Sequence, residues 1–69
     1  MDVRELVRVT QEYYKTGEQV WLDSMRDCEE EMKIDFYQSD FIEDIAKAGL
    51  WLGWSEAKTF ALIEEGLSE

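Results

Sequence analysis

The four residues Lys15-Thr16-Gly17-Glu18 decide the fold, because apolar residues with helical spacing lie on both sides of them. At about 100° per residue, this apolar stripe falls within one arc of about 120°. The stripe consists of Val3, Leu6, Val7, Thr10, Tyr13, Tyr14, Gly17, Trp21, Met25, Cys28 and Met32. Two helices joined by a loop would have no reason to keep the same phase. The pattern therefore favours one helix over about residues 2–33, with Gly17 on its apolar face, where a second backbone could approach closely.

A break at these four residues is the alternative. Glycine costs roughly 1 kcal/mol inside a helix, and Thr16 or Gly17 could form a turn. The polar face favours the single helix, because it offers i,i+4 ion pairs that each contribute about 0.2–0.5 kcal/mol. The predicted pairs are Arg8 with Glu12, Arg26 with Glu30, and Glu29 with Lys33.

A helix of about 31 residues would be roughly 46 Å long at 1.5 Å per residue. The remaining residues, 34–69, could not cover a stripe of that length. Extended apolar surface marks an interaction site, and the simplest solution is a symmetric homodimer packed along the helix. The predicted dimer interface consists of Leu6, Tyr13, Tyr14, Gly17, Trp21 and Met25.

The second half of the chain predicts a helical hairpin. Residues 34–38 are out of phase with the stripe and predict an extended connector. Asp40 as N-cap with Glu43 three residues later resembles a capping box and predicts a helix over 40–50. Ser55 then caps a helix over 55–65, which Gly66 terminates. With no proline in the chain, we predict an all-α protein that forms a single small domain over 1–69.

Residues 44–50, followed after a turn by residues 55–60, resemble the helix-turn-helix of DNA-binding regulators. The likeness rests on a first helix of small residues, a glycine in the turn and a Ser-capped second helix. In that family the second helix presents Arg, Lys, Asn or Gln to the bases. Here that helix offers mainly Glu56, Lys58, Thr59, Glu64 and Glu65. We therefore expect the hairpin geometry, and a transcription regulator is an alternative function.

The middle of the chain is strongly acidic. Residues 18–44 hold ten Asp or Glu against two Lys or Arg, which is −8 of the total charge of −10. Such a surface repels nucleic acid and anionic membranes and attracts basic protein surfaces. Asp23, Asp27 and Glu30 form an i, i+4, i+7 row, and Glu31 lies on the other flank of the stripe. These four carboxylates are the predicted partner-binding surface, although a charge run can also serve solubility alone.

Trp51 and Trp54 lie together at the predicted hairpin turn. Tryptophan is enriched in binding hot spots, so the two rings are candidates for partner contact. The alternative is that they fill the core against the first helix. The sequence leaves both interpretations open.

Several chemistries are disfavoured. One cysteine and no histidine exclude an intrachain disulfide and ordinary Cys/His zinc sites. No EF-hand loop, phosphate-binding loop or nucleophile elbow occurs. Cys28 lies between Asp27 and Glu29, which favour a packing role over a nucleophilic one. We expect no enzyme activity, metal or cofactor. Residues 1–5 show no apolar core of signal-peptide length, and no run of about 18 apolar residues occurs, so we also expect a cytoplasmic protein without membrane contact.

In size, acidity, helix content and lack of catalytic groups, the chain resembles the small inhibitor proteins that bacteriophages encode against host regulators and defence systems. Anti-CRISPR proteins, antirepressors, anti-activators and quorum-sensing antagonists are examples. The resemblance implies stoichiometric inhibition in the host cytoplasm, by masking a basic, nucleic-acid-binding surface of a host protein. Carboxylates would speed encounter, and aromatic contacts would supply affinity. A small structural or assembly protein is a further alternative.

Overall fold

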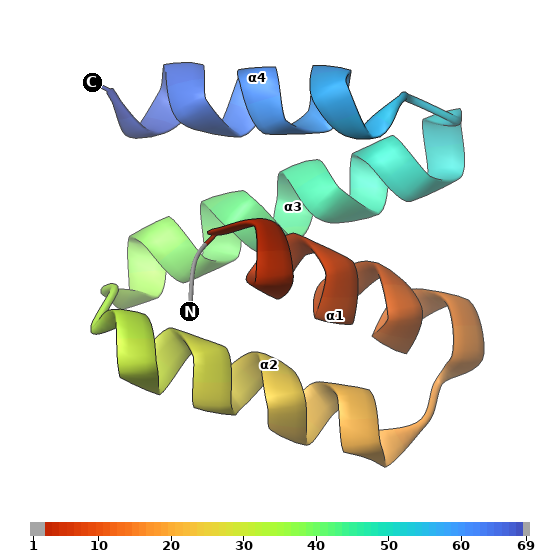
Figure 1. Ribbon diagram of the computed structural model, residues 1–69, viewed down its shortest axis with the longest axis vertical. Helices are drawn as coiled ribbons and strands as arrows, with labels where there is room; N and C mark the ends of the chain where they lie inside the picture. The colour runs from red at the N-terminus through yellow and green to blue at the C-terminus, as the bar shows by residue number, and fades with distance from the viewer. Residues whose placement is uncertain (1–2, 69) are drawn as a thin grey trace.

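The computed structural model describes residues 3–68 and has four α-helices in that range (Figure 1). They are α1 (Val3–Thr16), α2 (Gln19–Met32), α3 (Phe36–Leu52) and α4 (Glu56–Leu67). The described residues contain no strand, which confirms the predicted all-α class. Successive helices run in opposite directions, so α1 with α2 and α3 with α4 form two hairpins. The two hairpins pack together through contacts between α1 and α3. The molecule is flattened, with extents of 29 × 28 × 18 Å.

The prediction of one helix over residues 2–33 is wrong, and the alternative break is correct; its predicted first residue, Asp2, lies outside the described residues. Gly17 has a φ of +71°, and its N–H donates to the Tyr13 carbonyl at 2.7 Å, which ends α1. Glu18 is extended and precedes α2. A Cβ added at Gly17 would meet nothing within 4 Å. Gly17 therefore provides a left-handed backbone conformation and is not a point of close helix contact.

The apolar stripe keeps its phase because both helices turn the same face toward one core. α2 folds back along α1, so the two halves of the stripe pack against each other. The buried apolar residues come from all four helices: Leu6, Val7, Val9, Met25, Cys28, Ile42, Ala46, Phe60 and Ile63. A single chain thus covers much of the surface for which the sequence required a second copy.

The predicted connector at 34–38 is also wrong, because α3 begins at Phe36. The Asp35 carboxylate accepts a hydrogen bond from the Gln38 N–H at 2.8 Å, and the Gln38 side chain accepts one from the Asp35 N–H at 3.4 Å. This reciprocal pair is a capping box that starts the helix five residues before the predicted cap. Asp40 is consequently an exposed residue inside α3, not its N-cap.

The turn between α3 and α4 confirms the prediction that Ser55 caps the last helix. The Ser55 hydroxyl accepts from the Lys58 N–H at 3.2 Å. Gly53, with a φ of +73°, ends α3, and the Trp54 N–H donates to the Gly49 carbonyl at 3.0 Å. α3 therefore extends to Leu52, beyond the predicted end at residue 50.

Two glycines allow α3 and α4 to approach closely. A Cβ on Gly49 would lie 2.6 Å from Thr59 Oγ1, and a Cβ on Gly66 would lie 2.1 Å from the Phe41 ring. Gly66 is thus a packing residue within α4, and the prediction that it terminates the helix is wrong. Among the described helices, none combines the length and apolar character needed to cross a membrane.

Candidate functional site

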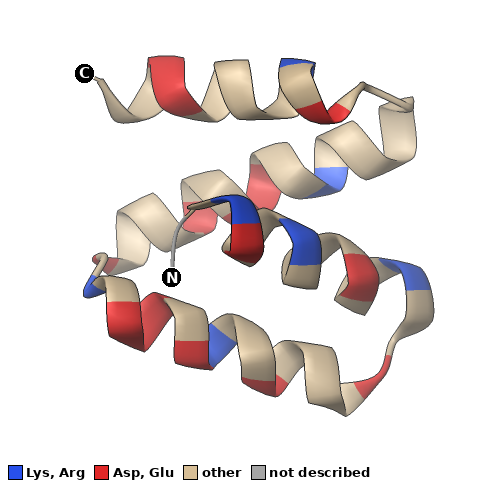
Figure 2. Ribbon diagram, in the orientation of Figure 1, with Lys and Arg blue, Asp and Glu red and all other residues tan. Residues whose placement is uncertain are grey.

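The four predicted partner-binding carboxylates lie exposed on α2, where acidic segments dominate (Figure 2). We call Asp23, Asp27, Glu30 and Glu31 the acidic face. Asp23 accepts a hydrogen bond from the Gln19 side-chain amide at 3.2 Å. The other three have no ion pair within residues 3–68, and together with Lys33 they line a shallow hollow of about 470 Å³. The acidic face therefore keeps most of its charge available to a cation.

None of the three predicted i,i+4 ion pairs, including Arg26 with Glu30, occurs among the ion pairs of residues 3–68, and Arg8 and Glu29 contact other helices instead. Arg8 reaches Glu56 on α4 at 3.4 Å, not Glu12. Glu29 accepts a hydrogen bond from the Ser39 hydroxyl on α3 and forms no ion pair with Lys33. Within the described range, the second ion pair joins Lys47 to Asp44 at 3.7 Å. Neither pair neutralises the acidic face.

Trp51 and Trp54 do not belong to the buried core. Trp51 is 67% exposed at the end of α3, beside the 68% exposed Leu52, and Trp54 is half-buried. Both rings are covered on one face by lysines of this chain. The Lys47 ammonium lies 5.9 Å from the Trp51 ring centroid, and the Lys58 ammonium lies 4.9 Å from that of Trp54. The rings are accessible to a partner but already engage cations.

Tyr14 connects α1 to two positions on α3. Its ring meets the Trp51 ring edge-on at a centroid distance of 6.2 Å, and its hydroxyl donates to the Glu43 carboxylate. This hydrogen bond, followed by burial and the negative charge of Glu43, raises the pKa of Tyr14 to about 12. Tyr14 is therefore neutral at physiological pH, and its hydroxyl is occupied within the chain.

The predicted dimer-interface residues do not form one face. Leu6 and Met25 are buried in the core, where packing within one chain accounts for them. Tyr13, Tyr14 and Trp21 are half-buried, and Gly17 is exposed in the turn. The fold-back at Gly17 separates positions that a continuous helix would have aligned.

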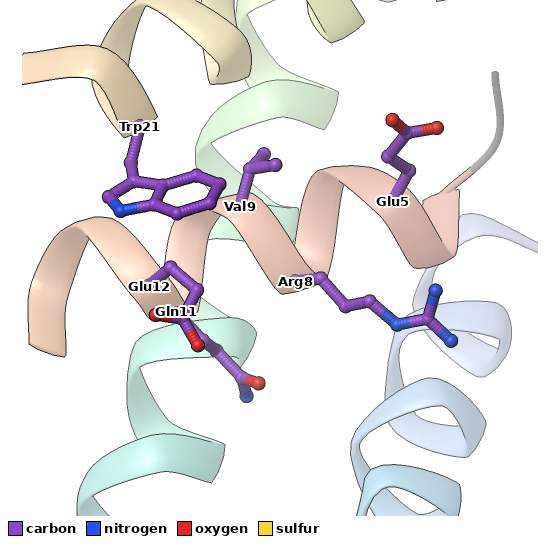
Figure 3. A pocket seen from close by; sticks show the side chains of 6 residues that line it. All are labelled: Glu5, Arg8, Val9, Gln11, Glu12 and Trp21. Carbon is purple, nitrogen blue, oxygen red and sulfur yellow. The ribbon is translucent and has the colours of Figure 1, made fainter.

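A groove beside Trp21 was not predicted from the sequence. It measures about 600 Å³ and is lined by Glu5, Arg8, Val9, Gln11, Glu12 and Trp21. We call it the Trp21 groove. Figure 3 shows the Trp21 ring lying across α1 next to Val9, while the Arg8 side chain extends away from the ring. The groove exists because α2 folds back over α1, so no pattern within one helix could have revealed it.

Phe36 and Tyr37 are a second feature that the sequence reasoning missed. They are 72% and 82% exposed in the first turn of α3, with ring centroids 5.9 Å apart. The sequence shows that the two residues are adjacent. Because the sequence pattern predicts an extended connector over residues 34–38, it does not indicate their place on a helix. They follow the end of α2 that carries Glu30 and Glu31, whereas Trp51 lies at the opposite end of α3.

The described residues contain no group of three or more metal-ligating side chains. The single thiol, Cys28, is 1% exposed, and its pKa is raised first by burial and then by Glu5, Glu31 and Asp27. Among the exposed charged side chains of residues 3–68, carboxylates outnumber Lys and Arg, and carboxylates and exposed aromatic rings both suit the binding of cations. Comparison of the chain with family models, curated proteins and solved structures gave no match.

Proposed function

We propose that this chain is a non-enzymatic binding protein that masks a basic surface of a partner protein with the acidic face of α2. The observation that carries the proposal is the exposure of Asp27, Glu30 and Glu31 without an ion pair in residues 3–68. Carboxylates fixed on one rigid helix attract a positive surface from a distance and increase the association rate. Because the basic surfaces of many proteins bind nucleic acid, the proposed partner is a nucleic-acid-binding regulator or defence protein, and its inhibition is stoichiometric.

Lasting affinity requires apolar contact beside the charge. Phe36 and Tyr37 are well placed for this role, because they are largely exposed and continue from the acidic end of α2. Trp51 and Leu52 offer a second apolar contact, at the other end of α3. A partner that covers the acidic face would reach Phe36 and Tyr37 first.

The test compares two variants with equal loss of charge. In the face variant, Asp27→Asn, Glu30→Gln and Glu31→Gln remove three charges from α2. The control variant carries Glu18→Gln, Glu64→Gln and Glu65→Gln. Immobilised wild type, face variant and control are incubated with a bacterial lysate at low and at moderate salt, and the captured proteins are identified by mass spectrometry.

We expect nucleic-acid-binding proteins that wild type and control retain, that the face variant loses, and that added duplex DNA displaces. Raising the salt should weaken capture, because screening shortens the range of the attraction. Equal capture by the face variant, or capture insensitive to both salt and DNA, contradicts the proposal.

The helix-turn-helix alternative receives less support. α4 would be the recognition helix, yet its exposed charged residues are Glu56, Glu64 and Glu65 against Lys58. This balance repels phosphate, and the acidic face adds to the repulsion. A gel shift on duplex DNA at low salt tests this alternative directly.

The homodimer remains a prediction. The chain has no long uncovered helix on which a second copy must pack, because α1 and α2 cover each other. Trp51 and Leu52 are among the exposed apolar residues on which a second copy could still pack. Light scattering decides the matter, since a single chain has a mass of 8.2 kDa and a dimer twice that mass. A larger assembly would favour the structural alternative.

A further inference from the structure

We propose that the Trp21 groove binds an arginine side chain from a basic segment of the partner. The proposal deepens the proposed function and rests on it, because it names the chemical group that this acidic protein recognises. Three observations carry it: the Trp21 ring lines the groove and has no cation over it in residues 3–68, Glu12 has no ion pair in that range, and Arg8 is directed away from the ring.

Trp21 is the one tryptophan without a cation of its own in residues 3–68. Lys47 lies over Trp51 and Lys58 over Trp54, as described above. Even Phe60 has a cation, since the Arg4 guanidinium carbon lies 5.1 Å from its ring centroid. Indole is the strongest cation-binding ring among protein side chains. The half-buried Trp21 therefore leaves open a contact that the other two tryptophans make with lysines of this chain.

Glu12 supplies the negative charge beside the ring. Its expected partner, Arg8, is bound to Glu56 on α4, so Glu12 has no ion pair within the described residues. Figure 3 shows Glu12 on the Trp21 side of the groove and the Arg8 side chain directed away from it. Glu5 adds a second carboxylate at the far end of the groove. An incoming cation thus meets the carboxylate of Glu12, while the guanidinium of Arg8, which also lines the groove, is directed toward Glu56 on α4.

The shape of the groove favours arginine over lysine. A planar guanidinium can stack on an indole face and at the same time donate N–H groups within its plane to a carboxylate. The methylene stem of arginine can lie on the apolar floor at Val9. A volume of about 600 Å³ also leaves room for residues that flank the arginine. The occupant is therefore an arginine within an extended basic segment.

The experiment uses nuclear magnetic resonance on the indole N–H signals, which distinguish the three tryptophans. The probes are three blocked tripeptides of arginine, lysine or citrulline, titrated at low salt. Trp21→Phe assigns the Trp21 signal. We expect the arginine peptide to shift that signal in a saturable way, the lysine peptide to bind several-fold more weakly, and the neutral citrulline peptide to leave it unchanged.

Glu12→Gln should weaken arginine binding about three- to tenfold, because it removes the charge but keeps the side-chain shape. The control, Glu64→Gln, removes one charge from α4 and should leave binding within about twofold. Since Trp21 packs against the core, Trp21→Leu is informative only if its circular dichroism matches wild type. Glu12→Gln therefore provides the main test.

The outcomes separate this inference from the proposed function. Shifts confined to the amides of Asp27, Glu30 and Glu31, with Trp21 unmoved, overturn the groove and support the acidic face. Saturable shifts at Trp21 that Glu12→Gln weakens support the groove, even if the face variant still captures every partner. Equal binding of the arginine and lysine peptides, or an unchanged Trp21 signal, overturns the inference.

Discussion

The Tyr14 hydroxyl donates a hydrogen bond across the α1–α3 contact to the Glu43 carboxylate, and this bond raises the pKa of Tyr14 to about 12. The ordinary value is 10.0, so the folded protein holds the phenol proton more tightly than the unfolded chain. The resulting stability is fully present below pH 10 and is lost as the pH rises toward 12.

We predict that Glu43→Gln lowers the pKa of Tyr14 toward its ordinary value, because the first cause of the shift is the hydrogen bond to Glu43. Titration of phenolate absorbance measures the change, and Tyr14→Phe identifies which of the three tyrosines is responsible. Glu43→Gln should also reduce the loss of stability between pH 10 and 12. An unchanged titration curve would contradict the assignment.

The second prediction concerns Gly17, which matters for its backbone conformation and not for a side-chain contact. With a φ of +71° and no atom near an added Cβ, Gly17→Ala should cost about 1 kcal/mol of folding free energy through left-handed strain. Gly17→Asn should cost less, because asparagine tolerates this region. Urea unfolding measures both values. Gly53→Ala is the matched control, with a φ of +73° and equal space. A much larger cost at Gly17 would indicate a tertiary contact.

Between elements, the closest approach is that of α3 to α4. Gly49→Ala places a methyl group 2.6 Å from Thr59 Oγ1, so we predict a loss of about 1–3 kcal/mol from overpacking. The double variant Gly49→Ala with Thr59→Ala should be less destabilised than the sum of its single changes, because the second change removes the clashing atoms. Thermal unfolding of the four proteins tests this. Simple additivity would show that the two residues do not limit the helix spacing.

The sequence predicted the helical class and the second hairpin, but not the number of helices or how the first two pack. The Ser55 cap and the α3–α4 hairpin follow from local chemistry and were correct. Periodicity specifies which face of a helix is apolar, but it is the same for one continuous helix as for two helices that fold onto a shared core. The contacts between α1 and α2 distinguish two folded helices from one continuous helix. These contacts join residues that are distant along the chain, so the periodicity of neighbouring residues does not reveal them. Asp35 competed with Asp40 as a cap and was the stronger one, because Gln38 completes its capping box.

The candidate site shows the same division. The acidic carboxylates could be placed on an exposed face because they lie away from the apolar stripe. The ion pair of Arg8 with Glu56 could not be predicted, since the two residues are 48 positions apart. The Trp21 groove is lined by residues of both α1 and α2, which the fold-back at Gly17 brings together, so it becomes visible only in three dimensions.

At the scale of the whole molecule, a net charge of −10 is confined to a body only 29 × 28 × 18 Å in size. The Debye length is about 30 Å at 0.01 M salt and about 8 Å at 0.15 M, so low salt leaves most charges interacting. We predict that Tm rises with salt over this range. The face variant should have a higher Tm than wild type at low salt and a smaller response to salt. A gain of about 1 kcal/mol corresponds to about 4–8 °C for a domain of this size. A Tm independent of salt would contradict the prediction.

Cys28 is the single thiol of the chain, and it is 1% exposed within the contact that holds α2 to the rest of the core. A thiol reagent in solution can reach this sulfur only when the packing around α2 opens. The rate of labelling therefore reports how often that part of the protein opens, without any engineered probe. If a partner binds the acidic face of the closed form, labelling should slow in proportion to occupancy. The same sulfur would then measure binding through protection from reaction.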